Sequence, residues 1–193
     1  MSELVVLQAV RLKGRVSRDD LAATLGADLG DVVDRLVGAG LLVDGPTLRL
    51  SPEGRERLEE LLSDERSNVD MTAVLAAYDE FCSVNGEFKG LVTDWQLKEG
   101  RPNTHQDADY DAAVLARLDD VHQRVTAIVA AAAAELPRLS RYTAKLQTAL
   151  DNIHAGETIW LARPLIDSYH TVWFELHEEL LLAAGLTRGT DDA

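Results

Sequence analysis

Residues 16–62 read VSRDDLAATLGADLGDVVDRLVGAGLLVDGPTLRLSPEGRERLEELL, and this stretch decides the fold of the N-terminal part of the chain. Ser17 is a residue type that caps helix N-termini, and Asp19 and Asp20 follow where acidic side chains favour the positive end of the helix dipole. Apolar residues then recur at helical spacing up to Gly26, a residue typical of helix ends. The pattern predicts one short helix here and another over roughly residues 29–38.

The second half of the same stretch predicts a hairpin followed by a helix. Two short apolar runs, residues 41–43 and 47–50, flank the turn sequence Asp-Gly-Pro. Ser51 then fits an N-cap, and Pro52 fits the first position of a helix. An apolar helical segment over residues 4–12 precedes all of these elements. The predicted order is therefore three helices, a two-stranded hairpin and a fourth helix.

This order is that of the winged-helix fold, and the residues resemble the MarR, ArsR and related families of bacterial regulators. The resemblance lies in the pattern LxxxGLL, in the strand that follows it and in LSPEGRERL, and it covers about a third of the chain. It implies that the third helix enters the major groove of DNA and that the hairpin, or wing, contacts the DNA backbone.

The chain departs from this pattern on the third helix. Asp28, Asp31 and Asp34 occupy positions where DNA-reading helices usually carry Ser, Thr, Gln, Asn or Arg. If this part of the chain binds DNA, we expect four arginines to contact the groove or the phosphates: Arg15, Arg18, Arg35 and Arg49. The alternative is a winged helix that makes protein contacts and leaves these arginines in solvent.

Composition limits the function classes. The chain has 193 residues and a net charge of −14, which argues against broad, non-specific binding of nucleic acid. Its longest unbroken apolar run, which includes residues 128–134, is too short to span a bilayer, and the first residues do not resemble a secretory signal. The single cysteine, Cys82, cannot form an internal disulfide. We expect a cytoplasmic protein that does not enter membranes.

The rest of the chain predicts a second, all-helical domain. We place the boundary after residue 66, giving a winged-helix domain over 1–66 and a helical domain over 67–193. Four apolar-striped segments of roughly 20–30 residues with short loops favour an antiparallel four-helix bundle. The predicted fold class is therefore mainly α. Because small DNA-binding modules usually act in pairs, we expect the bundle to form a homodimer.

Polar residues on two of these predicted helices indicate a ligand pocket inside the bundle. Asn85 shares a face with Tyr78, Cys82 and Val92, which we expect to be buried, so its amide needs a partner. Ligand pockets in bundles are mostly apolar with a few convergent polar groups. We expect a small polar or anionic ligand to be lined by Asn85, Trp95, His170, Trp173, Phe174 and His177. A packed core with an Asn–His hydrogen bond is the alternative.

Three histidines follow an aspartate by three residues, in the pairs Asp119/His122, Asp151/His154 and Asp167/His170. This spacing places both side chains on one helix face, where they form surface pairs or, less commonly, metal ligands. The sequence does not show that these pairs converge or that other residues hold the imidazoles in place, so we predict no metal site and no cofactor. No catalytic constellation is recognised either, and we do not expect an enzyme. The sequence favours a transcriptional regulator, with a winged-helix interaction module or a metal-binding bundle as alternatives.

Overall fold

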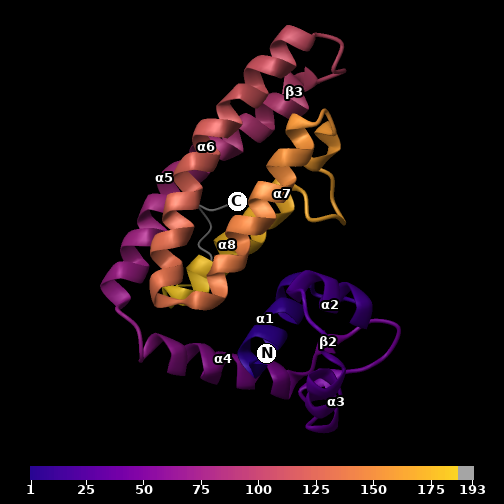
Figure 1. The fold of residues 1–193 in the computed structure, drawn as a ribbon, viewed down its shortest axis with the longest axis vertical. Coiled ribbons are helices and arrows are strands. Elements are labelled where there is room, and N and C mark those ends of the chain that lie inside the picture. Colours follow the sequence, from indigo (N-terminus) through magenta and orange to yellow (C-terminus); the bar gives the residue numbers. More distant parts are fainter. Residues whose placement is uncertain (187–193) are drawn as a thin grey trace. The chain divides into compact units, whose positions relative to one another are not determined.

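The computed structural model describes residues 1–186, and the chain in it is mainly helical (Figure 1). It divides into two compact units, Met1–Asn68 and Val69–Ala193. We call them the N-terminal unit and the helical unit. None of the helices in residues 1–186 combines the length and the apolar character needed to cross a bilayer.

The N-terminal unit contains three helices, a hairpin and a fourth helix. Its elements are α1 (Glu3–Lys13), α2 (Arg18–Leu25), α3 (Gly30–Gly38), β1 (Leu42–Val43), β2 (Arg49–Leu50) and α4 (Pro52–Arg66). Serines begin three of the helices: the hydroxyls of Ser2, Ser17 and Ser51 accept hydrogen bonds from backbone N–H groups of the first turns of α1, α2 and α4. The antiparallel strands pair Leu42 with Leu50.

A backbone bridge ties the hairpin to the segment between α1 and α2. Val16 and Leu48 exchange two hydrogen bonds, with N–O distances of 3.2 Å and 2.7 Å. Both side chains are buried, so the bridge brings the start of α2 and the hairpin onto one core. The sequence pattern did not predict this contact, because a single bridging residue leaves no alternation to detect.

The start of α4 packs directly against the chain before β1. Ser51 donates its hydroxyl to the carbonyl of Gly40 at 2.6 Å, and Gly54 is buried beside the carbonyl oxygen of Leu41. A Cβ atom at position 54 would lie 2.0 Å from that oxygen. Glycine is therefore required at position 54 by close approach of backbone to backbone.

We expect Gly54→Ala to destabilise the N-terminal unit by about 2 kcal/mol or more, because the backbone at Leu41 must move to admit the methyl group. Far-UV circular dichroism during urea denaturation measures the loss. Gly38→Ala is the matched control, since nothing lies within 4 Å of its Cβ position and the residue is helical. Equal stability of the two variants would contradict the packing described here.

The helical unit is built from four longer helices with short accessory elements. They are α5 (Met71–Gln96), β3 (Leu97–Lys98), β4 (Arg101–Pro102), α6 (Ala108–Glu135), the 3-10 helix η1 (Pro137–Ser140), α7 (Arg141–His154), the 3-10 helix η2 (Thr158–Trp160) and α8 (Tyr169–Ala183). Helix α5 packs against α6 and α8, and α7 packs against the same two helices. Figure 1 shows α5 and α6 side by side as a long pair.

The buried face of α5 matches the predicted one in part. Tyr78 and Val92, which we expected to be buried, are buried, whereas Cys82 is exposed. The buried residues of α5 follow steps of three and four: Val74, Ala77, Tyr78, Phe81, Val84, Phe88, Leu91, Val92 and Trp95. The bulky side chains of Phe81 and Phe88 bury more apolar area than Leu75 and Cys82, and they set the phase of the helix.

The last two helices are shorter than predicted. Helices α7 and α8 are 14 and 15 residues long rather than 20–30, and α8 begins at Tyr169 because Ser168 caps it. The connection after α5 contains a tight hairpin, β3–β4, whose turn residues Glu99 and Gly100 both have positive φ.

Candidate functional site

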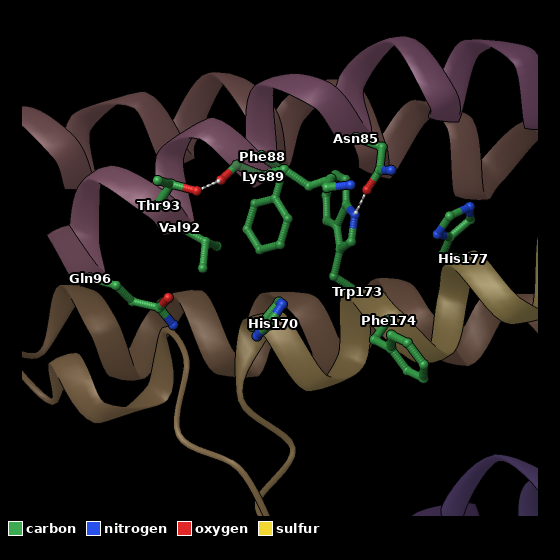
Figure 2. Close-up of a pocket in the computed structure, with 10 residues that line it drawn as sticks. All are labelled: Asn85, Phe88, Lys89, Val92, Thr93, Gln96, His170, Trp173, Phe174 and His177. Carbon is green, nitrogen blue, oxygen red and sulfur yellow. Dashed lines mark hydrogen bonds between the residues drawn. The ribbon is translucent and has the colours of Figure 1, made fainter. Parts of the chain in front are cut away.

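A pocket of about 370 Å³ lies between α5 and α8 in the helical unit (Figure 2). Both helices contribute residues at steps of three and four, which places one face of each helix toward the pocket. We call it the α5–α8 pocket, and it is lined by Asn85, Phe88, Lys89, Val92, Thr93, Gln96, His170, Trp173, Phe174 and His177. Five of the six residues predicted to line a pocket are in this set.

Trp173 forms the wall that joins the two helices. Its indole N–H donates to Oδ1 of Asn85 at 2.9 Å, and its ring stacks on Phe88 with 4.2 Å between centroids. Phe81 and Tyr169 complete the contacts of the indole, at 5.0 Å and 6.1 Å. The amide oxygen of Asn85 is thus occupied, and its Nδ2 group is the part that can donate to a ligand.

The two histidines line the pocket from different environments. His177 is 4% exposed and packs against Phe81 at 5.3 Å between ring centroids. His170 lies at the surface beside Phe88, and desolvation lowers the pKa of its imidazole. His170 is therefore mainly neutral at pH 7 and can donate one N–H without carrying a charge. Figure 2 places Gln96 at one end of the pocket and His177 at the other.

The lining of the α5–α8 pocket favours an anionic ligand. Lys89 contributes a cation, while Asn85, Thr93, Gln96 and the histidines contribute neutral polar groups, and none of the ten described lining residues is acidic. The chain as a whole carries a net charge of −14. An anion would meet donors here rather than carboxylates, and the aromatic wall would accept a planar apolar group.

Trp95 is the one predicted residue that does not line the α5–α8 pocket. A helix turns by about 100° per residue, so the line that runs from Asn85 through Lys89 and Val92 continues to Gln96. Trp95 is rotated by roughly 80° from Asn85 and is buried near the end of α5, where it lines a different pocket. The lining residues of α5 that were not predicted are Phe88, Lys89, Val92, Thr93 and Gln96, and they follow Asn85 along one side of the helix.

The three predicted Asp–His pairs along single helices do not form. Asp119 pairs with His154 across α6 and α7 at 2.9 Å, and Asp167 pairs with Lys145 at 2.9 Å. His122 is buried, where its ring nitrogens lie 3.2 Å from the Tyr169 hydroxyl and 3.1 Å from Oε1 of Gln147. No group of three potential metal ligands comes together within residues 1–186.

A buried ion cluster fixes α8 against the start of α7. Glu179 is fully buried and accepts hydrogen bonds from Arg138, from Arg141 at 2.6 Å and from the Tyr142 hydroxyl at 3.3 Å. Burial, followed by the charge of Glu179, raises the pKa of Tyr142 well above its usual value, so the phenol stays protonated and donates. The cluster positions α8, and with it the histidines of the pocket.

We expect Glu179→Gln to destabilise the helical unit by about 3–5 kcal/mol, because the buried guanidinium of Arg138 and the partly buried one of Arg141 would lose the charge of this carboxylate. Urea denaturation followed by tryptophan fluorescence measures the loss, since the three tryptophans all lie in this unit. Glu80→Gln, at an exposed site on α5, is the control and should change stability by less than about 0.5 kcal/mol. A loss no larger than that of the control would mean that the cluster is dispensable.

In the N-terminal unit, the structure pairs one of the four predicted DNA-contacting arginines with acidic residues. The guanidinium of Arg18 lies 2.7 Å from Oδ1 of Asp34 on α3 and 2.7 Å from Oδ2 of Asp44 beyond β1. Its hydrogen bond lowers the pKa of the Asp44 carboxyl. Arg18 can therefore reach a phosphate only by leaving these two carboxylates.

The other three arginines are exposed, and none has an ion pair with another residue of 1–186. Arg15 precedes Val16 and Arg49 follows Leu48, so the two arginines are neighbours across the bridge that joins these residues. Like charges opposite each other on paired strands repel unless an anion lies between them. Arg35 stands alone on α3, among the acidic residues of that helix.

Comparisons of the chain with protein-family models, with curated proteins and with solved structures give no match.

Proposed function

We propose that the protein is a ligand-responsive winged-helix regulator. The helical unit binds a small organic anion in the α5–α8 pocket, and the N-terminal unit binds DNA as part of a homodimer. The observation that carries the proposal is a pocket with an aromatic wall and hydrogen-bond donors but no acidic lining residue, in a chain of net charge −14.

The order of helices and strands in the N-terminal unit supports the DNA-binding part of the proposal. Three helices, a two-stranded hairpin and a fourth helix follow one another, and the bridge between Val16 and Leu48 adds a third backbone segment beside the hairpin. In the winged-helix interpretation α3 is the recognition helix and the β1–β2 hairpin is the wing. The exposed neighbours Arg15 and Arg49 then lie at the base of the wing, where a phosphate would relieve their mutual repulsion.

A second candidate function is recognition of a protein. The ion pairs of Arg18 with Asp34 and Asp44 favour it, because they remove one cation from the proposed DNA face. Asp28, Asp31 and Asp34 are exposed on or beside α3 and would repel phosphates. An arginine-rich or lysine-rich partner surface would match this face better than a DNA groove.

For DNA binding, we expect Arg49→Ala and Arg15→Ala each to weaken the affinity for all sequences alike and to lower the slope of log K against log salt by about 1. Arg35→Ala should also relax sequence preference, because Arg35 is the only basic residue on α3. Fluorescence anisotropy with labelled promoter fragments measures these effects.

Arg55→Ala is the matched control, since Arg55 is an exposed arginine on α4, outside α3 and the hairpin. Light scattering of the protein alone should give the mass of a dimer. If no DNA fragment is retained at low salt and a basic peptide is bound instead, the second candidate function replaces the first.

For the pocket, we expect benzoate to raise the melting temperature of the protein by mass action, and benzamide to do so less at the same concentration. Benzoate offers a ring to the Trp173 wall and a carboxylate to the donors, whereas benzamide lacks the charge. Differential scanning fluorimetry measures both shifts. The variant Lys89→Ala should abolish the difference between the two compounds, because Lys89 is the cation of the lining, while Ser83→Ala, at an exposed site outside the pocket, should preserve it.

A melting temperature that benzoate leaves unchanged up to millimolar concentration would exclude a planar carboxylate as the ligand class. Equal shifts with benzoate and benzamide would show that the pocket recognises the ring alone, and the anion preference proposed here would be wrong.

A further inference from the structure

A second pocket, of about 470 Å³, lies in the helical unit where α5 ends. It is formed by the end of α5, the loop after β4 and the segment that leads from η2 toward α8. We call it the hairpin pocket, and it is lined by Trp95, Gln96, His105, Thr158, Ile159, Ala162 and Arg163. Gln96 also lines the α5–α8 pocket, but the remaining residues are distinct.

His105 is held in the hairpin pocket with a strained backbone. Its φ of 55° lies in the left-handed region, which non-glycine residues rarely adopt. The Oδ1 atom of Asn103 accepts the backbone N–H of His105 at 3.1 Å, and the imidazole packs on the ring of Trp95 with 4.4 Å between centroids. Strain of this kind persists only where the surroundings fix the conformation, and it is commonest at binding sites.

A carboxylate behind the imidazole fixes its orientation. Oδ2 of Asp111 lies 3.0 Å from Nδ1 of His105, and Oδ1 of Asp111 accepts from Nδ2 of Asn103 at 2.9 Å. The same Nδ2 group donates to the carbonyl of Trp95 at 3.1 Å. Asp111 therefore holds the Nδ1–H form of His105, and the Nε2 atom points away from the carboxylate.

Arg163 supplies the cation of the hairpin pocket. It is exposed and has no ion pair with another residue of 1–186, although the chain has far more acidic than basic side chains. None of the seven described lining residues is acidic. Ile159, which is 50% exposed, and the partly buried Ala162 give the pocket an apolar side next to this cation.

We propose that the hairpin pocket binds the phosphate group of a small phosphate monoester. The guanidinium of Arg163 matches phosphate oxygens with paired N–H donors. Nε2 of His105 accepts from a P–OH group when the imidazole is neutral and donates to a P–O⁻ oxygen when it is protonated. The organic part of the ester covers Ile159 and Ala162, which distinguishes a monoester from the free phosphate ion.

NMR titration of the full chain with inorganic phosphate and with phenyl phosphate tests this site. The Cε1–H signal of His105, assigned with His105→Gln, should shift saturably with both compounds. We expect phenyl phosphate to bind about tenfold more tightly, because its ring removes apolar surface from water. Arg163→Ala should weaken both at least tenfold, while Arg101→Ala, an exposed arginine on β4 outside the pocket, should leave both unchanged.

Three results would overturn the proposal. The site does not bind phosphate if neither compound shifts the His105 signal up to about 10 mM, or if Arg163→Ala and Arg101→Ala weaken binding equally. The monoester assignment is wrong if inorganic phosphate binds as tightly as phenyl phosphate. None of these results depends on the α5–α8 pocket, so this proposal and the proposed regulator function can fail separately.

Discussion

The contact between Trp173 and α5 is the constraint on which the helical unit and its main pocket depend. The indole needs an acceptor for its N–H and apolar neighbours for its ring, and α5 provides both through Asn85 and Phe88. The hydrogen bond and the ring contacts of Trp173 together set the distance between α8 and α5 and the rotation of α8. The cavity lies beside the indole, and His170, Gln96 and Lys89 are among the residues that line it.

Acidic and basic side chains are paired differently in the two units. In the helical unit, the acidic side chains nearest the core are paired, as Glu179 is with Arg138 and Arg141, so the pocket lining can stay free of them. In the N-terminal unit, Arg18 bridges two acidic residues while Arg15 and Arg49 remain exposed without an ion pair among the described residues. In the proposed function, the balance between these arginines and the aspartates of α3 decides between DNA and a basic protein as the partner of this unit.

Much of the fold could be predicted from sequence, because local signals mark it. Serine caps, glycine ends and periodic apolar residues predicted the elements of residues 1–66. Cys82 was wrongly expected on the buried face of α5, because it fits a helical stripe as well as Phe81 and Phe88 do, and only the packing of α5 against α6 and α8 decides between them. His105 was not predicted at all, because its site is made by a hairpin, a strained residue and a distant 3-10 segment that no spacing connects.

The central claim is that a ligand in the helical unit controls DNA binding by the N-terminal unit. The most direct measurement is the dissociation constant for a promoter fragment at fixed salt, with and without saturating benzoate. The account predicts a change of at least about fivefold, together with the reciprocal change in benzoate affinity when DNA is added. Benzoate binding that leaves the DNA dissociation constant unchanged would contradict it.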